Sequence, residues 1–176
     1  MSLADLRSEY EERYSDINEI ISLTSAIYEE SETLEQNNPQ NLDFCLETRV
    51  NILKSSLHMM LYNQVENTAR GCIESIYDHL QDSNINFSSL KDKFQISILH
   101  RIISDNETGK GLYNKIGGDI SKKIISASMN IRKEFNGNVC IPVLHRITKA
   151  YGIQVAASQE CRNGYDLDIL KDIRNE

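Results

Sequence analysis

Five polar side chains recur at three- and four-residue steps in the middle of this sequence. They are Asn63, Glu66, Asn67, Arg70 and Glu74. On a helix, this spacing places them on one face, with Glu66 and Arg70 within reach of each other as an i,i+4 ion pair. Two interpretations are open, because such a stripe is either an ordinary solvated face or the polar wall of a site.

Arginine and histidine are the other residues whose chemistry matters here. Arg174 stands near the end of the chain, and its guanidinium group is always charged and can bind phosphate oxygens in pairs. The four histidines are scattered singly, and none lies in H-x-x-x-H or beside a cysteine at ligand spacing. Because a metal site needs such a cluster, the sequence predicts no metal site and no cofactor.

Glycines between Asp105 and Gly118 raise the question of a phosphate-binding loop. Their spacing matches neither G-x-x-x-x-G-K-[ST] nor G-x-G-x-x-G, and no strand precedes them. We therefore expect residues 105–118 to form a flexible loop. There is also no G-x-S-x-G motif, so no serine nucleophile stands out.

The elements that carry these residues are predicted to be helices. Apolar residues recur with a helical period over residues 3–37 and again over 42–81, where Gly71 is the weakest point and a bend or break is expected. Shorter helices are predicted over 88–104, 119–135, from Pro142 to Gly152, and from Asp166 onward.

The stretch from Ile52 to Tyr62 is apolar in nearly every direction around its predicted helix. A helix that is apolar all round is buried all round. Either it lies at the centre of a bundle, or its second side meets another subunit. Both alternatives fit an all-α fold, in which two long antiparallel helices support several shorter ones.

Length and composition set the outer limits. The chain has 176 residues and a mass of 20.1 kDa, so we expect residues 1–176 to form a single domain. Its net charge of −7 argues against a domain-wide nucleic-acid surface, although not against a local site. Neither a membrane-spanning run nor an apolar leader is visible, which predicts a cytoplasmic protein with reduced cysteines, three of them buried.

Two blocks of sequence resemble the HEPN family. The first runs Leu61-Tyr62-Asn63-Gln64-Val65-Glu66 and continues to Ile73-Glu74-Ser75-Ile76-Tyr77, which is similar to the second helix of HEPN domains. The second begins at Gly164-Tyr165-Asp166-Leu167 and ends with Leu170-Lys171-Asp172-Ile173-Arg174-Asn175-Glu176, which resembles the final HEPN helix. The order of segments also resembles that of small stand-alone bacterial HEPN proteins.

The resemblance implies a function as well as a HEPN-like helical bundle. HEPN domains of this kind are mostly metal-independent endoribonucleases, often toxins or defence effectors, and they act as dimers with Arg/His pairs in a shared cleft. It assigns Arg174 to phosphate binding at the catalytic centre, with Asn175 orienting the substrate. Asn63, Glu66 and Arg70 are candidates for the substrate-binding cleft wall. The implied partners are a second copy, an RNA substrate, and an antitoxin or other protein.

The sequence departs from the family pattern at one place. In the motif, a His follows the Arg after four to six residues, whereas this sequence stops at Glu176 and no other Arg has a His at that spacing. The last predicted helix also stops without a glycine cap or a proline, so we expect the chain to be cut within this helix and to be inactive as given. A natural C-terminus that frays is the alternative. The alternatives are a non-catalytic HEPN-type module that dimerises and binds a protein, or an unrelated helical scaffold.

Overall fold

The computed structural model describes residues 2–37, 44–104, 108–116, 120–128, 135, 138–156 and 158–175. These residues contain helices and no strand, which confirms the all-α prediction. The α-helices are α1 (Leu3–Asn37), α2 (Phe44–Asp82), α3 (Asp92–Ser104), α4 (Gly109–Ile116), α5 (Ile120–Ala127), α7 (Ile141–Tyr151) and α8 (Tyr165–Asn175). Two short 3₁₀ helices, η1 (Phe87–Ser89) and η2 (Gln159–Gly164), precede α3 and α8.

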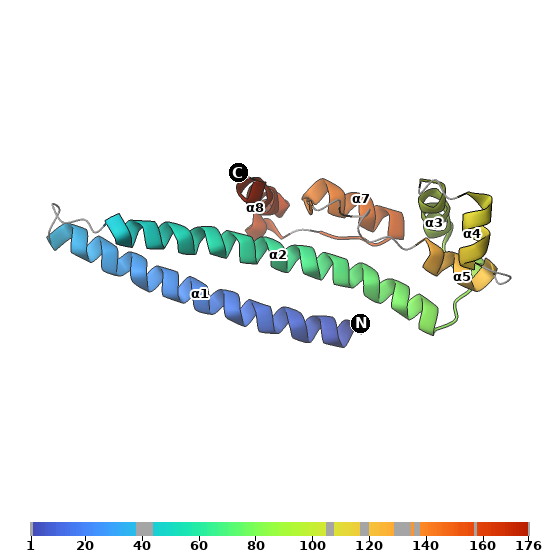
Figure 1. Ribbon diagram of the computed structural model, residues 1–176, viewed down its shortest axis with the longest axis horizontal. Helices are drawn as coiled ribbons and strands as arrows, with labels where there is room; N and C mark the ends of the chain where they lie inside the picture. The colour runs from blue at the N-terminus through green and yellow to red at the C-terminus, as the bar shows by residue number, and fades with distance from the viewer. Residues whose placement is uncertain are drawn as a thin grey trace.

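Helices α1 and α2 form a long antiparallel hairpin on which the rest of the chain is built (Figure 1). The start of α1 is fixed by Ser2 and Asp5, whose side chains each accept a hydrogen bond from the other's backbone N–H, at 3.1 and 3.0 Å. Leu6 and Ile17 are buried on its inner face. Helix α2 is continuous over 39 residues, so of the bend or break expected along this segment, no break occurs. Gly71 itself is buried.

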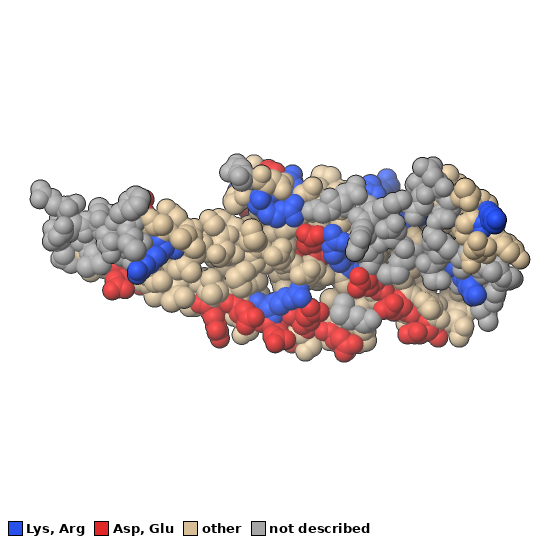
Figure 2. All heavy atoms as spheres, in the orientation of Figure 1, with Lys and Arg blue, Asp and Glu red and all other residues tan. Residues whose placement is uncertain are grey.

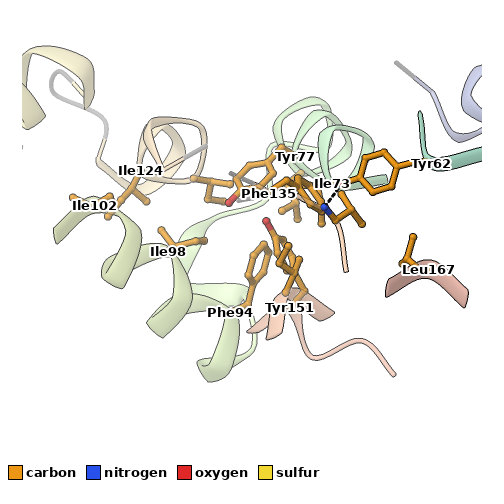
Figure 3. Close-up of a cluster of buried hydrophobic side chains, with 14 residues drawn as sticks. Tyr62, Ile73, Tyr77, Phe94, Ile98, Ile102, Ile124, Phe135, Tyr151 and Leu167 are labelled. Carbon is orange, nitrogen blue, oxygen red and sulfur yellow. Dashed lines mark hydrogen bonds between the residues drawn. The ribbon is translucent and has the colours of Figure 1, made fainter. Parts of the chain in front are cut away.

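The main hydrophobic core lies around the C-terminal half of α2, where α3, α5 and α7 meet it (Figure 3). Three aromatic rings form its centre: Tyr77 packs edge-on against Phe94 and Tyr151, with centroids 6.4 and 6.3 Å away. Arg101 donates hydrogen bonds to both tyrosine hydroxyls, which satisfies them inside the core.

The predicted ends of α7 are confirmed. Pro142 stands in the first turn, and Gly152 takes the left-handed conformation at φ 70°. The N–H of Gly152 reaches the Lys149 carbonyl at 3.2 Å, and the N–H of Ile153 reaches the Thr148 carbonyl at 2.8 Å. This pair of bonds closes the helix as a Schellman motif does.

Two predictions of local structure were wrong. Residues 109–116, expected as loop, form α4, whose first turn is capped by Thr108 through a hydrogen bond from the N–H of Gly111. Helix α3 begins at Asp92 rather than at residue 88. The predicted helix over 119–135 corresponds to α5 as far as Ala127, and residues 129–134 lie outside the described part of the chain.

Burial around the Ile52–Tyr62 stretch bears on the first of the two alternatives left open by the sequence, the centre of a bundle. Tyr62 is fully buried, but Ile52 is 59% exposed and Met59 is 52% exposed. In Figure 1, α7 and α8 lie over α2 only from its middle onward, while its first turns run beside α1. The stretch is therefore not the centre of a bundle within this chain.

The cysteines are less buried than predicted. Cys72 and Cys161 are exposed and Cys140 is half-buried, while the Cys45 side chain lies outside the described residues. The three that are described carry free thiols. In the segments that the structure describes, no helix is long and apolar enough to cross a membrane.

Candidate functional site

The position of α8 brings the end of the chain to the middle of α2 (Figure 1). Three consecutive residues of positive φ, ending with the buried Gly164 at φ 92°, turn the chain into this helix. Leu167 is then buried in the core, and the Asp168 carboxylate accepts a hydrogen bond from the N–H of Ile141 at 3.2 Å. These contacts fix α8 against α2 and α7.

Arg174 lies in the last turn of α8 and makes four contacts. Its guanidinium carbon lies 4.2 Å from the centroid of the Tyr62 ring, within the range of a cation–π interaction. Nη1 is 3.5 Å from the Glu66 carboxylate. Nη2 donates hydrogen bonds to the side-chain oxygens of Asn138, at 2.6 Å, and Asn175, at 3.1 Å. The side chain is 23% exposed, so solvent still reaches it.

Glu66 connects two arginines. One of its oxygens accepts hydrogen bonds from Nε and Nη2 of Arg70, at 3.0 and 2.6 Å, while the other faces Arg174. Arg70 in turn lies over the ring of Phe135, with 5.3 Å between guanidinium and centroid. Two guanidinium groups and one carboxylate leave a local excess of one positive charge. On a chain whose net charge is −7, this is a local cationic site.

Tyr62 connects this site to the hydrophobic core. Its ring is fully buried, and its hydroxyl accepts a hydrogen bond from the N–H of Val139 at 2.6 Å (Figure 3). The bond fixes the segment that carries Asn138. Tyr62 therefore positions Arg174 in two ways. Its ring contacts the Arg174 guanidinium group, and its hydroxyl fixes the segment of Asn138, whose side-chain oxygen accepts a hydrogen bond from that group.

The structure brings together four of the five residues predicted from the sequence, namely Arg174, Asn175, Glu66 and Arg70. Asn63 lies elsewhere. It is exposed and lines a groove between α1 and α2, together with Arg13, Gln64 and others. The polar stripe is therefore divided, because Glu66 faces α8 whereas Asn63, Asn67 and Glu74 line the grooves along α1.

Two residues of the site escaped sequence reasoning. Tyr62 stands in the block that resembles the HEPN second helix, but nothing in the sequence indicates that its ring lies under Arg174. Asn138 is 36 residues from Arg174 and is the last residue of the turn-like tripeptide Asn136-Gly137-Asn138. Only the tertiary fold brings that segment to α8.

Charge is distributed unevenly around the site. Figure 2 shows basic side chains over α8 and acidic ones in a long row along α1. A hydrogen bond with Asp172 raises the pKa of Lys171, and the same carboxylate pairs with this lysine at 3.0 Å, so Lys171 adds no net charge to the site. Among the described residues, no group of three or more His, Cys, Asp or Glu side chains could hold a metal ion.

Comparison with known protein families gives a match over nearly the whole chain. The model of the family described as HEPN_MAE_28990-like HEPN matches residues 2–176. Neither the curated proteins nor the solved structures include a match to this chain.

Proposed function

This chain belongs to the HEPN_MAE_28990-like HEPN family, and from that premise we propose that it supplies one half of a dimeric, metal-independent endoribonuclease site of the toxin or defence type. The observation that carries the proposal is the convergence of Arg174, Glu66 and Arg70, from two helices, on one cationic site. RNA is the proposed substrate.

Arg174 is suited to binding a phosphate. Its planar guanidinium group offers paired donors to phosphate oxygens, and it stabilises the negative charge that grows in the transition state. The Tyr62 ring and the Asn138 and Asn175 oxygens restrict the orientations of this group. A positioned cation loses less conformational entropy on binding than a mobile one.

A second copy would meet this site along α2. Ile52, Met59 and Glu66 follow one another at seven-residue steps, so they lie on one side of the helix. The first two are more than half exposed, whereas the third contacts α8 through Arg174. The exposed apolar surface therefore continues directly into the cationic site. A two-fold axis across this surface would bring two Arg174 side chains into one cleft.

The proposed reaction also needs a proton-transfer group. The RNA 2′-hydroxyl attacks the adjacent phosphorus, its proton passes to a base, and the leaving 5′-oxygen receives a proton from an acid. A histidine is suited to both transfers because it titrates near neutral pH. In the 176 residues, no Arg is followed by a His at the family's spacing. We therefore expect this chain to bind RNA and to cut it about 10²–10⁴-fold more slowly than one that carries the histidine.

The test is an RNA cleavage assay on two chains. One has the 176 residues, and the other is lengthened by Ala-Ala-His, which places a histidine three positions beyond Glu176. The longer chain should cut a single-stranded RNA, and Arg174→Ala in that chain should abolish cleavage while its circular dichroism stays unchanged. Equal cleavage by both chains would place the catalytic residues elsewhere.

A non-catalytic module that dimerises and binds a protein is the second candidate. Two observations favour it. Arg174 is paired with Glu66 and Asn138 of its own chain, and the net charge of the chain is −7, which disfavours RNA as a partner. If neither chain binds or cuts RNA while both form dimers, this candidate replaces the nuclease.

A further inference from the structure

Charge is divided between the long hairpin and the shorter helices that follow it. Residues 1–82, which end with α2, contain 5 Lys and Arg against 16 Asp and Glu. Residues 83–158, which include α3, α4, α5 and α7, contain 11 Lys and Arg against 5 Asp and Glu. The net charges of the two segments are therefore −11 and +6. We call residues 83–158 the basic region.

The cations of the two segments also differ in their partners. On the hairpin, Arg7, Arg13 and Arg70 each form an ion pair with a glutamate four residues away. In the basic region, Lys93 and Lys149 are exposed, and neither forms an ion pair with any residue that the structure describes. A lysine of this kind binds a phosphate without first breaking an ion pair within the protein.

Helix α7 connects the basic region to the Arg174 site. At its first residue, the N–H of Ile141 donates a hydrogen bond to α8 at 3.2 Å, and Asn138, three residues earlier, accepts one from Arg174. At its last residue, the centroid of the Tyr151 ring lies 4.8 Å from that of Phe94 in α3. With 11 residues at about 1.5 Å each, α7 extends over about 16 Å between the site and α3.

The outer face of α7 carries cations and no acid. Its exposed residues are Pro142, His145, Arg146 and Lys149. At about 100° per residue they share an arc of about 100°, and the buried Ile147 lies on the other side of the helix. Helix α7 contains no Asp or Glu. Figure 2 shows basic side chains over α7, and Figure 1 shows α7 and the acidic α1 on opposite sides of α2.

Two ligands carry the negative charge that suits this face, namely an RNA strand and the acidic hairpin of a second copy. Geometry favours RNA, because the face begins where Arg174 is proposed to bind a phosphate. The proposed dimer contact involves Ile52 and Met59 in the first half of α2, whereas α7 packs on the second half through Tyr151. The proposed dimer therefore leaves the outer face of α7 open to a strand.

We propose that the outer face of α7, together with Lys93 at the start of α3, binds the RNA phosphates next to the one held by Arg174. Lys149 lies near the end of α7, and Lys93 precedes Phe94, which contacts that end. The acidic α1 repels the strand from the other side of α2. Such contacts position a strand without reading its bases, so they add affinity without sequence preference. The inference rests on RNA as the proposed substrate.

The test uses fluorescence anisotropy on the complete chain with two labelled single-stranded RNAs, of about twelve and about three nucleotides. Lys149→Gln and Lys93→Gln should each weaken binding of the long RNA at least threefold. Each should also reduce the slope of log affinity against log salt by about 0.7, as one lost phosphate contact does on a single strand. The short RNA should bind both variants as it binds the unmodified chain. Lys54→Gln is the matched control, because Lys54 is an exposed lysine of α2 that faces Tyr28 of α1.

Unchanged affinity and salt slope in both Lys149→Gln and Lys93→Gln would overturn the inference, as would an equal loss in Lys54→Gln or no binding of the long RNA. Circular dichroism checks that each variant is folded. If Lys149→Gln reduces self-association in light scattering and leaves RNA affinity unchanged, the face binds the hairpin of a second copy instead.

Arg174→Ala separates this inference from the proposed function, because it should weaken binding of both RNAs. If Arg174→Ala has no effect while the two lysine variants weaken the long RNA, the α7 face binds RNA and the proposed function is wrong. If Arg174→Ala weakens both RNAs while the lysine variants have no effect, the inference about α7 is wrong and the proposed function is retained.

Discussion

At the scale of single residues, Tyr62 links the core to the candidate site. Its hydroxyl is an acceptor for the buried N–H of Val139, and its ring lies under Arg174. Tyr62→Phe keeps the ring but leaves that N–H without its partner, which costs about 1–3 kcal/mol. Urea unfolding should show this loss, with the m value unchanged.

Tyr62→Leu separates the two roles of this tyrosine. It removes both the hydrogen bond and the aromatic face, so RNA affinity should fall as well as stability. Tyr62→Phe should keep the affinity, because the ring remains. If Phe and Leu reduce RNA binding equally, the ring does not position Arg174.

Residue-scale chemistry was only partly predictable from the sequence. Glu66 and Arg70 were placed together by their spacing, and the HEPN resemblance added Arg174 and Asn175. The same helical spacing also included Asn63, which the structure places in the groove along α1. A periodic pattern indicates that residues share a broad face. It does not indicate which neighbour each part of that face meets.

At the scale of elements, α2 separates two apolar surfaces that look alike in the sequence. Met59 is 52% exposed on the side that leads to Arg174, whereas the adjacent Met60 lines the groove against α1. Met59→Asp should therefore convert dimers into monomers without unfolding the chain, because an unpaired carboxylate is strongly unfavourable in an apolar interface. Light scattering at tens of micromolar, a rough working range for weak interfaces, measures the mass.

Two further variants serve as controls for this prediction. Leu23→Asp changes an exposed residue of α1 and should leave the dimer intact. Met60→Asp should instead lower the unfolding temperature, because it places a charge between α1 and α2. A wild-type chain that is monomeric under these conditions would contradict the proposed interface.

Helix prediction succeeded where apolar periodicity is long or where proline and glycine mark the ends of a helix, and it failed at α4. The bounds of α1 and the ends of α7 follow from period, proline and glycine signals. Helix α4 was missed because its two glycines resemble a loop, although Thr108 supplies the cap and Leu112 packs against the core. Eight residues provide too few turns for a periodic signal to outweigh the glycines.

At the scale of the whole molecule, charge is divided between an acidic α1 and a local cationic site on α2 and α8. This division explains why the net charge of −7 gave no sign of the proposed phosphate site. Total charge sets long-range attraction and repulsion, whereas a phosphate is bound by a few positioned donors. The proposed dimer likewise depends on a second copy, whose contacts the pattern of one chain does not reveal.

The proposed chemistry also predicts the response to chelators. The histidine and Arg174 would supply the proton transfers and the charge stabilisation, so the lengthened chain should cut RNA equally well in excess EDTA. The assay compares initial rates with and without EDTA, and with added magnesium or manganese. Activity that returns only with a divalent ion would require a metal mechanism instead.

The central claim is that Arg174 binds the phosphate of RNA, and the most direct measurement is RNA affinity in matched arginine variants. Fluorescence anisotropy with a labelled single-stranded RNA compares the 176-residue chain with Arg174→Ala, Arg174→Lys and Arg162→Ala. Arg162 is the control, because it is an exposed arginine just before α8 that pairs with Asp166.

We predict that Arg174→Ala weakens binding about tenfold or more, since a charge-assisted contact contributes about 1.5–3 kcal/mol. Arg174→Lys should recover little of this loss because an ammonium group lacks paired donors. Arg162→Ala should bind as the unmodified chain does. Equal affinity of the Arg174→Ala and unmodified chains, or equal losses in Arg174→Ala and Arg162→Ala, would contradict the assignment of the site.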